Sequence, residues 1–380
     1  MKIKILLLFL FVFVFSFVKA GDTVDVRIFT ETELKSFRFI PLSNSYDVYS
    51  DTAKVYTIAA NDTLVLKYES DSIHLYYHKK TLGIYGYLRF QKKGYINNFC
   101  IIPVPARKKN PSFDDNLLVF LRNKKMILVN RVALDSYVAG VSEAESGTQA
   151  SAEYYKMQSV LARTFVLGHM NRHEKDGYNL CSSTHCQAFN GRPKSIKVLT
   201  ATISTKGMVV VDDSNHLITA AYHANCGGMT ANCEDVWSQP VSYLRSVKDT
   251  FCLKSPSAKW EKKMPLAEWK SILKKKYNFS FPDSVKNDTL YCFKQPVRKL
   301  YLYENPKIPL KKVRPDLGLK STFFEVEVNG DQVILKGRGF GHGLGMCQEG
   351  AMQMAKKGMT FLQIITFYFP GTKVIILDSK

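Results

Sequence analysis

The chain has 380 residues, of which 46% are hydrophobic and 23% charged, and its formal net charge is +20. Such a composition is that of an ordinary globular protein rather than a disordered chain, and the length is sufficient for two domains with buried cores. The excess of positive charge favours a polyanionic partner, with a basic surface that serves solubility alone as the alternative.

The first twenty residues have the pattern of a signal peptide. Lys2 and Lys4 precede an apolar run from Ile5 to Val18, and the small residue Ala20 suits cleavage after it. The apolar run is shorter than the roughly 20 residues of a membrane span, which leaves an uncleaved anchor as the alternative. Cleavage removes three lysines and no acids, so the formal charge falls from +20 to +17. We therefore expect an exported protein of the periplasm or cell-wall space, whose polyanionic partners are acidic wall polymers or membrane surfaces and not nucleic acid.

Residues 21–128 are predicted to form a β-rich accessory domain. Short runs alternate apolar and polar residues, as in Val24–Ile28, Leu64–Tyr68, Ile73–Tyr77 and Leu117–Leu121. Asn, Asp, Ser and Gly separate these runs, which is typical of a small all-β domain with one buried face. No acid-base or metal-binding pattern is found here, so the domain is expected to be non-catalytic.

The second domain, residues 129–376, opens with two predicted helices. The first runs through Ala144, and the second spans Ser151 to His169 with Ser151 as its N-cap. Glu145 lies at the junction between them, which is a plausible position for a catalytic acid. A solvated glutamate near a helix end is the alternative interpretation.

Cys181, His185 and Cys186 fall within six residues and can supply three ligands to a tetrahedral zinc ion. A structural zinc site needs a fourth ligand, which His173 or a residue of the stretch from His223 to Cys226 would have to supply. A disulfide between Cys181 and Cys186 is the alternative in an oxidising compartment. Disulfides joining residues 226 and 233, or 252 and 292, are also compatible with the sequence, which does not fix the connectivity.

Further along, a β-hairpin is predicted over residues 207–222, and it delivers His223 and the pair Gly227-Gly228 to a strand end. Residues 251–320 are rich in lysine and are predicted to be an elaboration of the second domain, with a helix over 265–277. A second hairpin is predicted over 324–335, with Asn329-Gly330 in a type I′ turn.

That hairpin leads into a glycine-rich loop, residues 337–345, which has five glycines in nine residues and holds His342. A backbone of this kind must turn sharply or lie against another group. A helix is then predicted over 347–357, and Thr360 with Gln363 forms a capping-box pattern at the start of the last helix.

Five separated motifs together resemble the stage II sporulation protein D / amidase-enhancer (SpoIID/LytB) family, in order and spacing, across roughly residues 132–374. They are Leu134-Asp135-x-Tyr137-Val138-x-Gly140-Val141-x-x-x-Glu145, Lys156-x-Gln158-x-Val160-x-Ala162-Arg163-Thr164, Thr184-His185-Cys186-Gln187, Cys226-Gly227-Gly228 with Asp235-Val236-Trp237, and Gly337-Arg338-Gly339-x-Gly341-His342-Gly343-x-Gly345-Met346-x-Gln348-x-Gly350-Ala351.

The resemblance implies an α+β protein whose second domain is a mixed α/β SpoIID-like domain with a glycan-binding cleft. Glu145 matches the family's catalytic glutamate, with Glu143 as its rival. Some members carry zinc near the His-Cys pair, which favours zinc at Cys181, His185 and Cys186; no other cofactor is expected. We expect the substrate groove to be lined by a set of residues in which Arg163 or lysines face the lactyl carboxylates: Arg163, Tyr222, His223, Gly227, Gly228, Gly341, His342, Gly343 and Gln348.

By resemblance, the expected activity is that of a lytic transglycosylase that cuts peptide-stripped glycan strands of peptidoglycan. One glutamate suffices for this reaction, whereas a two-carboxylate hydrolase needs a second acid at about 5 to 9 Å. The alternative is a non-catalytic glycan-binding protein that enhances a cell-wall amidase. A hydrolase that uses the Cys/His cluster directly is disfavoured, since such a ligand set is more often structural.

Overall fold

The computed structural model describes residues 23–106, 110–237, 239–280 and 288–377. The predicted signal peptide, residues 1–20, lies outside these ranges, and its cleavage stays a prediction. Among the described residues, no helix combines the length and the hydropathy of a membrane span.

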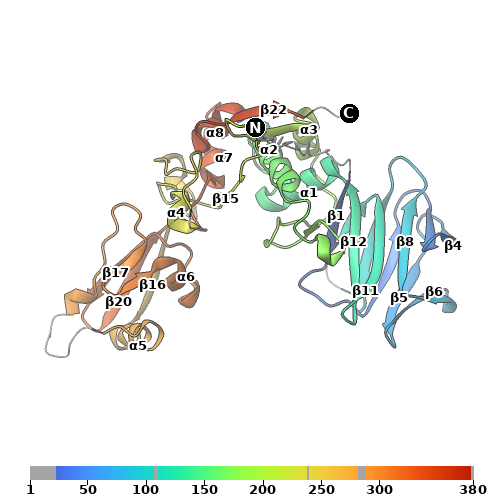
Figure 1. Cartoon of the computed structure of the whole chain (residues 1–380), viewed down its shortest axis with the longest axis horizontal. Helices are drawn as coiled ribbons and strands as arrows, with labels where there is room; N and C mark the ends of the chain where they lie inside the picture. Colours follow the sequence, from blue (N-terminus) through green and yellow to red (C-terminus); the bar gives the residue numbers. More distant parts are fainter. Residues whose placement is uncertain (1–22, 107–109, 238, 281–287, 378–380) are drawn as a thin grey trace, which may run out of the picture.

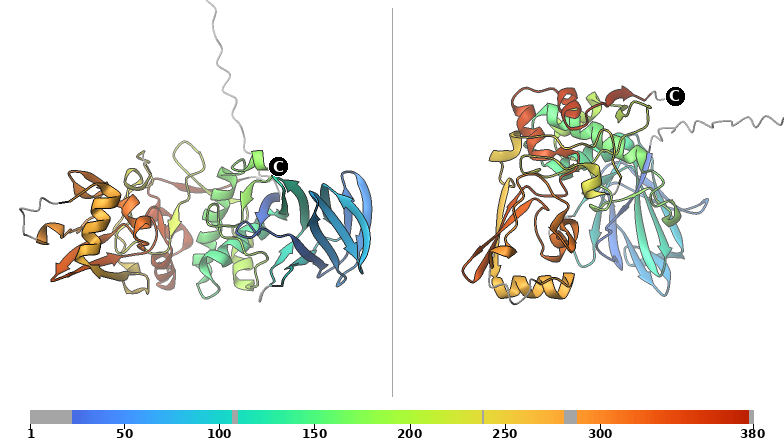
Figure 2. Two further views of the ribbon diagram at one scale, coloured as in Figure 1. Left: turned by 90° about the horizontal axis from the view of Figure 1, so that it is seen from below. Right: turned by 60° about the vertical axis from the view of Figure 1, so that its left-hand side comes forward.

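The described chain is a mixed α/β protein, as expected, and its elements form three lobes in a row (Figure 1). We call them the β lobe (residues 23–133), the central lobe (134–258 and 339–377) and the distal lobe (259–338). The left view of Figure 2 shows the same row from below, with the C-terminal segment returning to the helices of the central lobe.

Alternation of apolar and polar residues builds the β lobe as two packed sheets. In β1, for example, Val24, Val26 and Ile28 are buried and the residues between them are partly exposed. The seven-stranded sheet has the order β13 (Leu180–Cys181), β1 (Thr23–Ile28), β12 (Lys125–Ala133), β11 (Asn116–Arg122), β8 (Tyr87–Lys92), β3 (Tyr46–Ser50), β4 (Ala53–Ile58). The six-stranded sheet has the order β10 (Ser112–Asp114), β9 (Asn98–Pro103), β2 (Ser36–Pro41), β5 (Leu64–Glu69), β6 (Ser72–Tyr77), β7 (Lys80–Tyr85).

Helices dominate the central lobe. They are α1 (Leu134–Ser146), α2 (Ala152–Gly168), α3 (Ile196–Ser204), α4 (Cys233–Val236), α7 (Gln348–Lys356) and α8 (Phe361–Tyr368), with short 3-10 turns η1 (Glu174–Asp176) and η2 (Phe251–Lys254). Two predicted caps are confirmed: the Ser151 hydroxyl accepts the Tyr154 N–H at 3.4 Å at the start of α2, and Thr360 forms a capping box with Gln363 before α8.

The hairpin predicted over residues 207–222 is wrong in its second arm. β14 (Met208–Val211) forms and a tight turn follows, but only an isolated bridge between Val211 and Leu217 continues the pairing. On that edge the Thr164 hydroxyl of α2 accepts the Val210 N–H at 2.9 Å, while the opposite edge of β14 pairs with the C-terminal strand β22 (Lys373–Ile376). The chain therefore runs on to β15 (Tyr222–His223), which pairs in parallel with β21 (Met346–Cys347).

The lysine-rich segment belongs to a distal lobe with its own core. Its sheet has the order β16 (Lys259–Pro265), β20 (Gln332–Arg338), β19 (Phe324–Asn329), and the other elements are β17 (Tyr301–Glu304), β18 (Lys307–Pro309), α5 (Leu266–Tyr277), α6 (Leu310–Asp316) and η3 (Asp288–Tyr291). The predicted helix is α5, whose fully buried Trp269 packs into this core while its terminal lysines face outward. The predicted 324–335 hairpin is also confirmed.

The type of turn in that hairpin differs from the prediction. Asn329 pairs with Gln332, so the two loop residues are Gly330 and Asp331. Of these, only Gly330 has a positive φ, 55°. A type I′ turn requires a positive φ at both loop positions, so the Asn-Gly sequence is displaced by one residue from the positions that a type I′ turn would use.

The β lobe and the central lobe are joined without a linker. β12 ends at Ala133 and α1 starts at Leu134, so the predicted domain boundary at residue 128 falls inside a strand. The loop that follows α2 returns to the first sheet, where β13 pairs in parallel with β1. Side chains of α1 and of this loop, such as Tyr137 and Phe189, share the hydrophobic core of the sandwich.

Candidate active site

Glu145 lies in the last turn of α1, where the helix ends against a glycine. Gly147 has a φ of 66° and its N–H donates to the Glu143 carbonyl at 2.8 Å. Because this positive φ is not helical and suits glycine, the helix stops and the chain turns away soon after Glu145. The carboxyl group is partly buried and faces the loop that follows Cys186.

Two donors hold the Glu145 carboxylate. The backbone N–H of Ala188 donates to its Oε1 at 2.9 Å, and the Tyr222 hydroxyl donates a second hydrogen bond. The side-chain amide of Gln187 donates in turn to the Tyr222 hydroxyl at 3.4 Å. Burial raises the pKa of Glu145 by more than the two hydrogen bonds, which favour the ionised form, lower it. A raised pKa lets a glutamic acid keep its proton closer to neutral pH, as a general acid must.

Glu143, the rival carboxyl, is engaged elsewhere. Its Oε2 accepts the backbone N–H of Lys194 at 2.9 Å and that of Ser195 at 2.8 Å. These amides lie immediately before α3, where a negative charge is favoured by the helix dipole. Glu143 therefore fastens the start of α3 to α1, whereas Glu145 is held by the Ala188 N–H and the Tyr222 hydroxyl.

His223 and His342 come together from distant parts of the chain, with ring centroids 5.5 Å apart. The Leu344 N–H donates to Nδ1 of His342, so its Nε2 carries the proton that it donates to the Tyr222 carbonyl at 3.1 Å. Nδ1 of His223 donates to the Leu344 carbonyl at 3.1 Å. Burial lowers the pKa of His342 to about 4 and that of His223 as well, so both rings are neutral at pH 7.

In this tautomer of His223 the proton is on Nδ1, so Nε2 can accept a hydrogen bond. Its Nε2 is buried and has no hydrogen-bond partner among the described residues. The same holds for the Gln187 Oε1 and the Gln348 Nε2. Buried polar atoms without partners are rare in folded proteins, and a bound polar ligand is one way of satisfying them.

The predicted glycines serve close packing between loops. Gly341 has a φ of 114°, and a Cβ at this position would lie 2.8 Å from the His223 Cβ. Gly227 has a φ of 71°, and a Cβ there would lie 2.6 Å from the Arg338 carbonyl carbon. Gly228 and Gly343 likewise face protein side chains, those of Leu253 and Arg298. The glycine-rich loop is thus shaped to fit against the segment that carries His223.

The structure does not support the assignment of Arg163 to substrate binding. Its side chain is 1% exposed and lies inside the central lobe. The guanidinium donates to the Asp135 carboxylate at 2.9 Å and to the carbonyls of Thr202, Thr205 and Met208. Arg163 therefore joins α1, α2, α3 and the start of β14, and has no free face toward a ligand.

A groove of about 810 Å³ lies beside this site. Its walls come from α1, from the loop over residues 182–194 and from the β lobe near residues 28–32 and 110–113. Ala188 and Glu143 line it, but none of the predicted substrate-binding residues does. The groove thus borders the loop that holds Glu145, on the side facing the β lobe.

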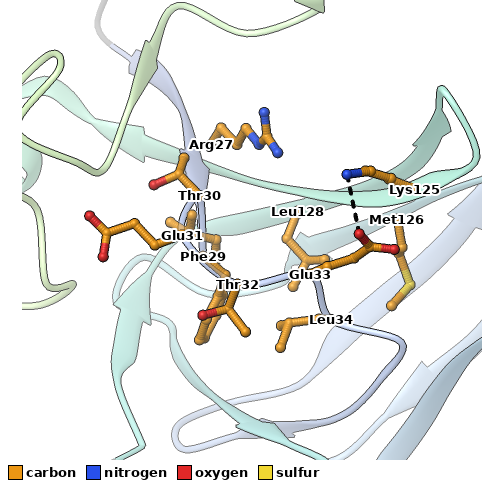
Figure 3. Close-up of a pocket in the computed structure, with 11 residues that line it drawn as sticks. Arg27, Phe29, Thr30, Glu31, Thr32, Glu33, Leu34, Lys125, Met126 and Leu128 are labelled. Atoms are coloured by element: carbon orange, nitrogen blue, oxygen red, sulfur yellow. Dashed lines mark ion pairs between the residues drawn. The ribbon is translucent and has the colours of Figure 1, made fainter.

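A second hollow of about 290 Å³ is confined to the β lobe (Figure 3). It is formed by the end of β1, the segment leading to β2 and the start of β12, and it is bridged by an ion pair between Glu33 and Lys125 at 3.2 Å. No predicted site residue lines it, and it shares residues 28–32 with the groove.

The predicted metal ligands come together with His173. Ligand atoms of His173, Cys181, His185 and Cys186 lie within 4.8 Å of one another. The two sulfur atoms are 3.4 Å apart, and His185 Nδ1 is 3.7 Å from each. With bonds of about 2.3 Å to sulfur and 2.0 Å to nitrogen, a tetrahedral zinc ion spaces its ligands by about 3.3 to 3.8 Å. The four side chains fit zinc, and the segment after Cys186 carries the amide that holds Glu145.

Comparison with known proteins identifies the family. The model described as "Stage II sporulation protein" matches residues 122–211. Stage II sporulation protein D of Bacillus subtilis (strain 168) is 31% identical over 267 residues, which cover 66% of this chain and 77% of that protein. The chain belongs to the SpoIID/LytB family.

Two further relatives are similar in sequence to this SpoIID/LytB protein. Stage II sporulation protein D of Bacillus amyloliquefaciens is 27% identical over 267 residues, covering 66% of this chain and 76% of that protein. The amidase enhancer of Bacillus subtilis (strain 168) is 28% identical over 289 residues, covering 61% of this chain and 39% of that protein. The 122–211 match contains Glu145 and all four metal-binding candidates, whereas His223 and His342 lie beyond it.

Three residues near the site of this SpoIID/LytB protein were not predicted as functional. Ala188 acts through its backbone N–H, which no side-chain pattern can reveal. Gln187 and Trp237 stand in motifs quoted for the family resemblance, and that was the available signal. The Trp237 ring is 43% exposed, and its centroid lies 6.2 Å from that of His342.

Proposed function

We propose that this SpoIID/LytB protein is an exported lytic transglycosylase of peptidoglycan, with Glu145 as its single acid-base residue. The observation that carries the proposal is the Glu145 carboxyl, which is partly buried, held by the Ala188 N–H and the Tyr222 hydroxyl, and raised in pKa. Its nearest acidic neighbour in the sequence, Glu143, is bound to backbone amides. A single acid-base carboxyl suits a transglycosylase better than a hydrolase that needs two.

In the proposed reaction, protonated Glu145 donates its proton to the oxygen that links N-acetylmuramic acid C1 to N-acetylglucosamine. As that bond breaks, the C6 hydroxyl of the muramoyl residue attacks C1, and the Glu145 carboxylate accepts the hydroxyl proton. The products are a free N-acetylglucosamine hydroxyl and a 1,6-anhydro-muramoyl end, and the enzyme is again protonated. No water is consumed, so the reaction has no need of a second carboxylate that would activate water.

The proposed substrate is a glycan strand from which stem peptides have been removed. The exposed ring of Trp237 beside His342 offers a face on which a sugar ring can stack. The neutral His223, with its bare Nε2, can accept a hydrogen bond from a sugar hydroxyl. The mature charge of +17 favours the acidic cell wall as the working environment of an exported protein.

A second function is favoured by one observation, the similarity to a protein named amidase enhancer. In that case the same site would bind glycan without cutting it, and the partner would be a cell-wall amidase. Product analysis separates the two proposals. The mature protein would be incubated with amidase-stripped glycan strands and the products examined by mass spectrometry. Anhydro-muramoyl ends support the transglycosylase, whereas intact strands with retained glycan binding support the enhancer.

Tyr222→Phe is expected to move the high-pH limb of the rate profile to higher pH. The Tyr222 hydroxyl stabilises the ionised form of Glu145, so its loss raises the pKa of Glu145 further. The acid form, which protonates the leaving oxygen, then persists to higher pH, and activity is lost later as pH rises. Initial rates across a pH series would measure this shift of the high-pH limb.

Tyr154→Phe is the matched control, because the Tyr154 hydroxyl bonds to Ser146 and Gln158. An unmoved or lowered limb in Tyr222→Phe would contradict the assignment.

We further propose a structural zinc ion held by His173, Cys181, His185 and Cys186. His173→Ala is expected to remove one equivalent of zinc per chain, measured by elemental mass spectrometry, and to lower product formation because the Ala188 amide loses its support. Asp176→Asn is the milder comparison, since Asp176 bonds to Nδ1 of His173 at 3.3 Å; such an outer partner changes metal affinity by about 10- to 100-fold. Unchanged zinc content in His173→Ala, or a Cys181–Cys186 disulfide in the unmodified protein, would rule the zinc site out.

A further inference from the structure

A second cluster of metal-binding side chains lies inside the central lobe, apart from the one described above. It consists of Cys226, Asp249, Cys252 and Cys347, and all four residues are buried. One ligand atom from each lies within 4.8 Å of the other three. The residues come from three segments: the loop after β15, the 3-10 turn η2 with the residue before its N-cap, and the residue before α7. The sequence alone suggested other pairings, in which Cys226 joined residue 233 and Cys252 joined residue 292.

The spacing within this cluster suits a tetrahedral metal ion. The Cys226 sulfur is 3.4 Å from the Cys252 sulfur and 3.3 Å from Oδ2 of Asp249. A zinc ion with bonds of about 2.3 Å to sulfur and 2.0 to 2.2 Å to oxygen separates its ligands by about 3.4 to 3.8 Å. The four side chains therefore need little movement to enclose an ion of that size.

Charge gives an independent reason to expect a cation here. Asp249 is 0% exposed, and its carboxylate accepts the Tyr368 hydroxyl at 2.8 Å and the Phe251 N–H at 2.9 Å. No arginine, lysine or histidine forms an ion pair with it among the described residues. A buried ionised carboxylate next to three sulfur atoms is unfavourable unless it takes up a proton or a positive charge compensates it. A divalent cation bound between them supplies that charge.

The backbone around the cluster is arranged as it is around metal-bound thiolates. The N–H groups of Cys226 and Gly350 each approach the Cys347 sulfur at 3.3 Å, and those of Gly227 and Gly228 donate to the Cys252 sulfur. Gly350 has no room for a side chain, since a Cβ would lie 2.2 Å from Oδ2 of Asp249. Amide donors stabilise negatively charged sulfur, which is the form that binds metal.

We propose that Cys226, Asp249, Cys252 and Cys347 bind a second structural zinc ion. On binding, the three thiols release their protons and the carboxylate completes a closed four-ligand shell, with no position left open for substrate. A Cys226–Cys252 disulfide is the competing arrangement in an oxidising compartment; it would leave Cys347 as a buried thiol beside Asp249. The ion would fasten the glycine-rich loop and α7 to the segment that carries His223, since Cys226 and Cys347 lie at the ends of these segments. This inference does not depend on any activity of the protein.

Metal content and thiol state of the full mature protein, purified without chelator, test the proposal together. Native mass spectrometry of the unmodified chain is expected to show two zinc ions per chain. Alkylation in denaturant without reductant is expected to modify Cys226, Cys252 and Cys347 once the metal is released. Cys347→Ser and Asp249→Asn should each reduce the zinc content toward one, and His173→Ala should remove the other ion. Cys100→Ser is the matched control, because Cys100 is half-buried in the β lobe and lies outside both clusters.

In His173→Ala only the second zinc ion is expected to remain. X-ray absorption at the zinc edge of this variant should therefore show three sulfur ligands and one oxygen ligand. The proposal fails if the unmodified chain holds at most one zinc ion, which His173→Ala removes, or if a peptide linking Cys226 to Cys252 is recovered without reductant. Both results are read from the unmodified chain or from a variant outside the cluster, so misfolding of a cluster variant cannot obscure them.

Discussion

Glu145→Gln is expected to lower the rate of anhydro-muramoyl end formation by about 10²- to 10⁴-fold, the range typical of a positioned general acid-base group. The glutamine amide keeps the size of the side chain and can still accept the Ala188 N–H, so the fold and glycan binding should persist. It cannot donate a proton to the glycosidic oxygen. Mass spectrometry of the products from peptide-stripped strands measures the rate, and a thermal melt of the same sample establishes that the variant is folded.

Glu143→Gln is the matched control, because it changes the same chemical group two residues away. Its carboxylate accepts amide N–H groups at the start of α3, so its neutralisation should affect stability by about 1 kcal/mol and leave the product distribution unchanged. If Glu143→Gln abolished the products and Glu145→Gln did not, the roles of the two carboxyls would have to be exchanged. If both variants and the parent left strands intact while binding them, the amidase-enhancing function would stand.

Arg163→Leu is expected to destabilise the protein by about 3 to 5 kcal/mol, the range for removing one partner of a buried ion pair. The change leaves Asp135 without its partner and removes one hydrogen bond from each of the carbonyls of Thr202, Thr205 and Met208. Chemical denaturation followed by tryptophan fluorescence and circular dichroism would measure the loss of stability.

Arg245→Leu provides the comparison, since it also removes an arginine from an ion pair, with Glu234 at 2.9 Å, but that arginine is 43% exposed. Exposed pairs of this kind contribute about 0 to 1 kcal/mol. A substrate-binding role for Arg163 would give a different result, namely a raised KM with unchanged unfolding. That outcome would restore the role that was expected from the sequence and contradict the structural one argued from its burial.

Local patterns in the sequence predicted the elements whose partners lie nearby. The N-cap of α2, the capping box of α8, the helix α5 and the β19–β20 hairpin depend on residues within a few positions of one another. The second arm of the hairpin over 207–222 was wrong because its pairing with β14 stops near Leu217, where the Thr164 hydroxyl accepts the Val210 N–H at 2.9 Å. A contact from a helix 46 residues earlier leaves no local signal in the hairpin sequence. Periodicity also cannot distinguish an arginine that lines a groove from one that joins helices. Arg163 was therefore predicted to bind substrate, although its side chain is buried between helices.

The candidate site was predictable in part for the same reason. Glu145 could be located because it follows a periodic helix, and Cys181, His185 and Cys186 because they are close in sequence. His173 stood among several candidates for the fourth ligand, and only the folding of the loop after α2 brings it to the sulfurs. The cluster at Cys226, Asp249, Cys252 and Cys347 joins segments more than 120 residues apart, so no spacing rule could have assembled it.

The pairing of β13 with β1 also bears on how the chain folds as it is synthesised. β1 is the outer strand of its sheet until residues 179–182 arrive, when the Asn179 side chain and N–H, and the Ser182 N–H, bond to its backbone. An uncovered strand edge is a template for pairing with another chain. Roughly 150 residues must emerge before that edge is covered, and the segment that covers it carries the first metal-binding cluster. With zinc bound there as proposed, metal capture would coincide with the closing of an aggregation-prone edge, and we expect the yield of soluble protein to depend on the supply of zinc.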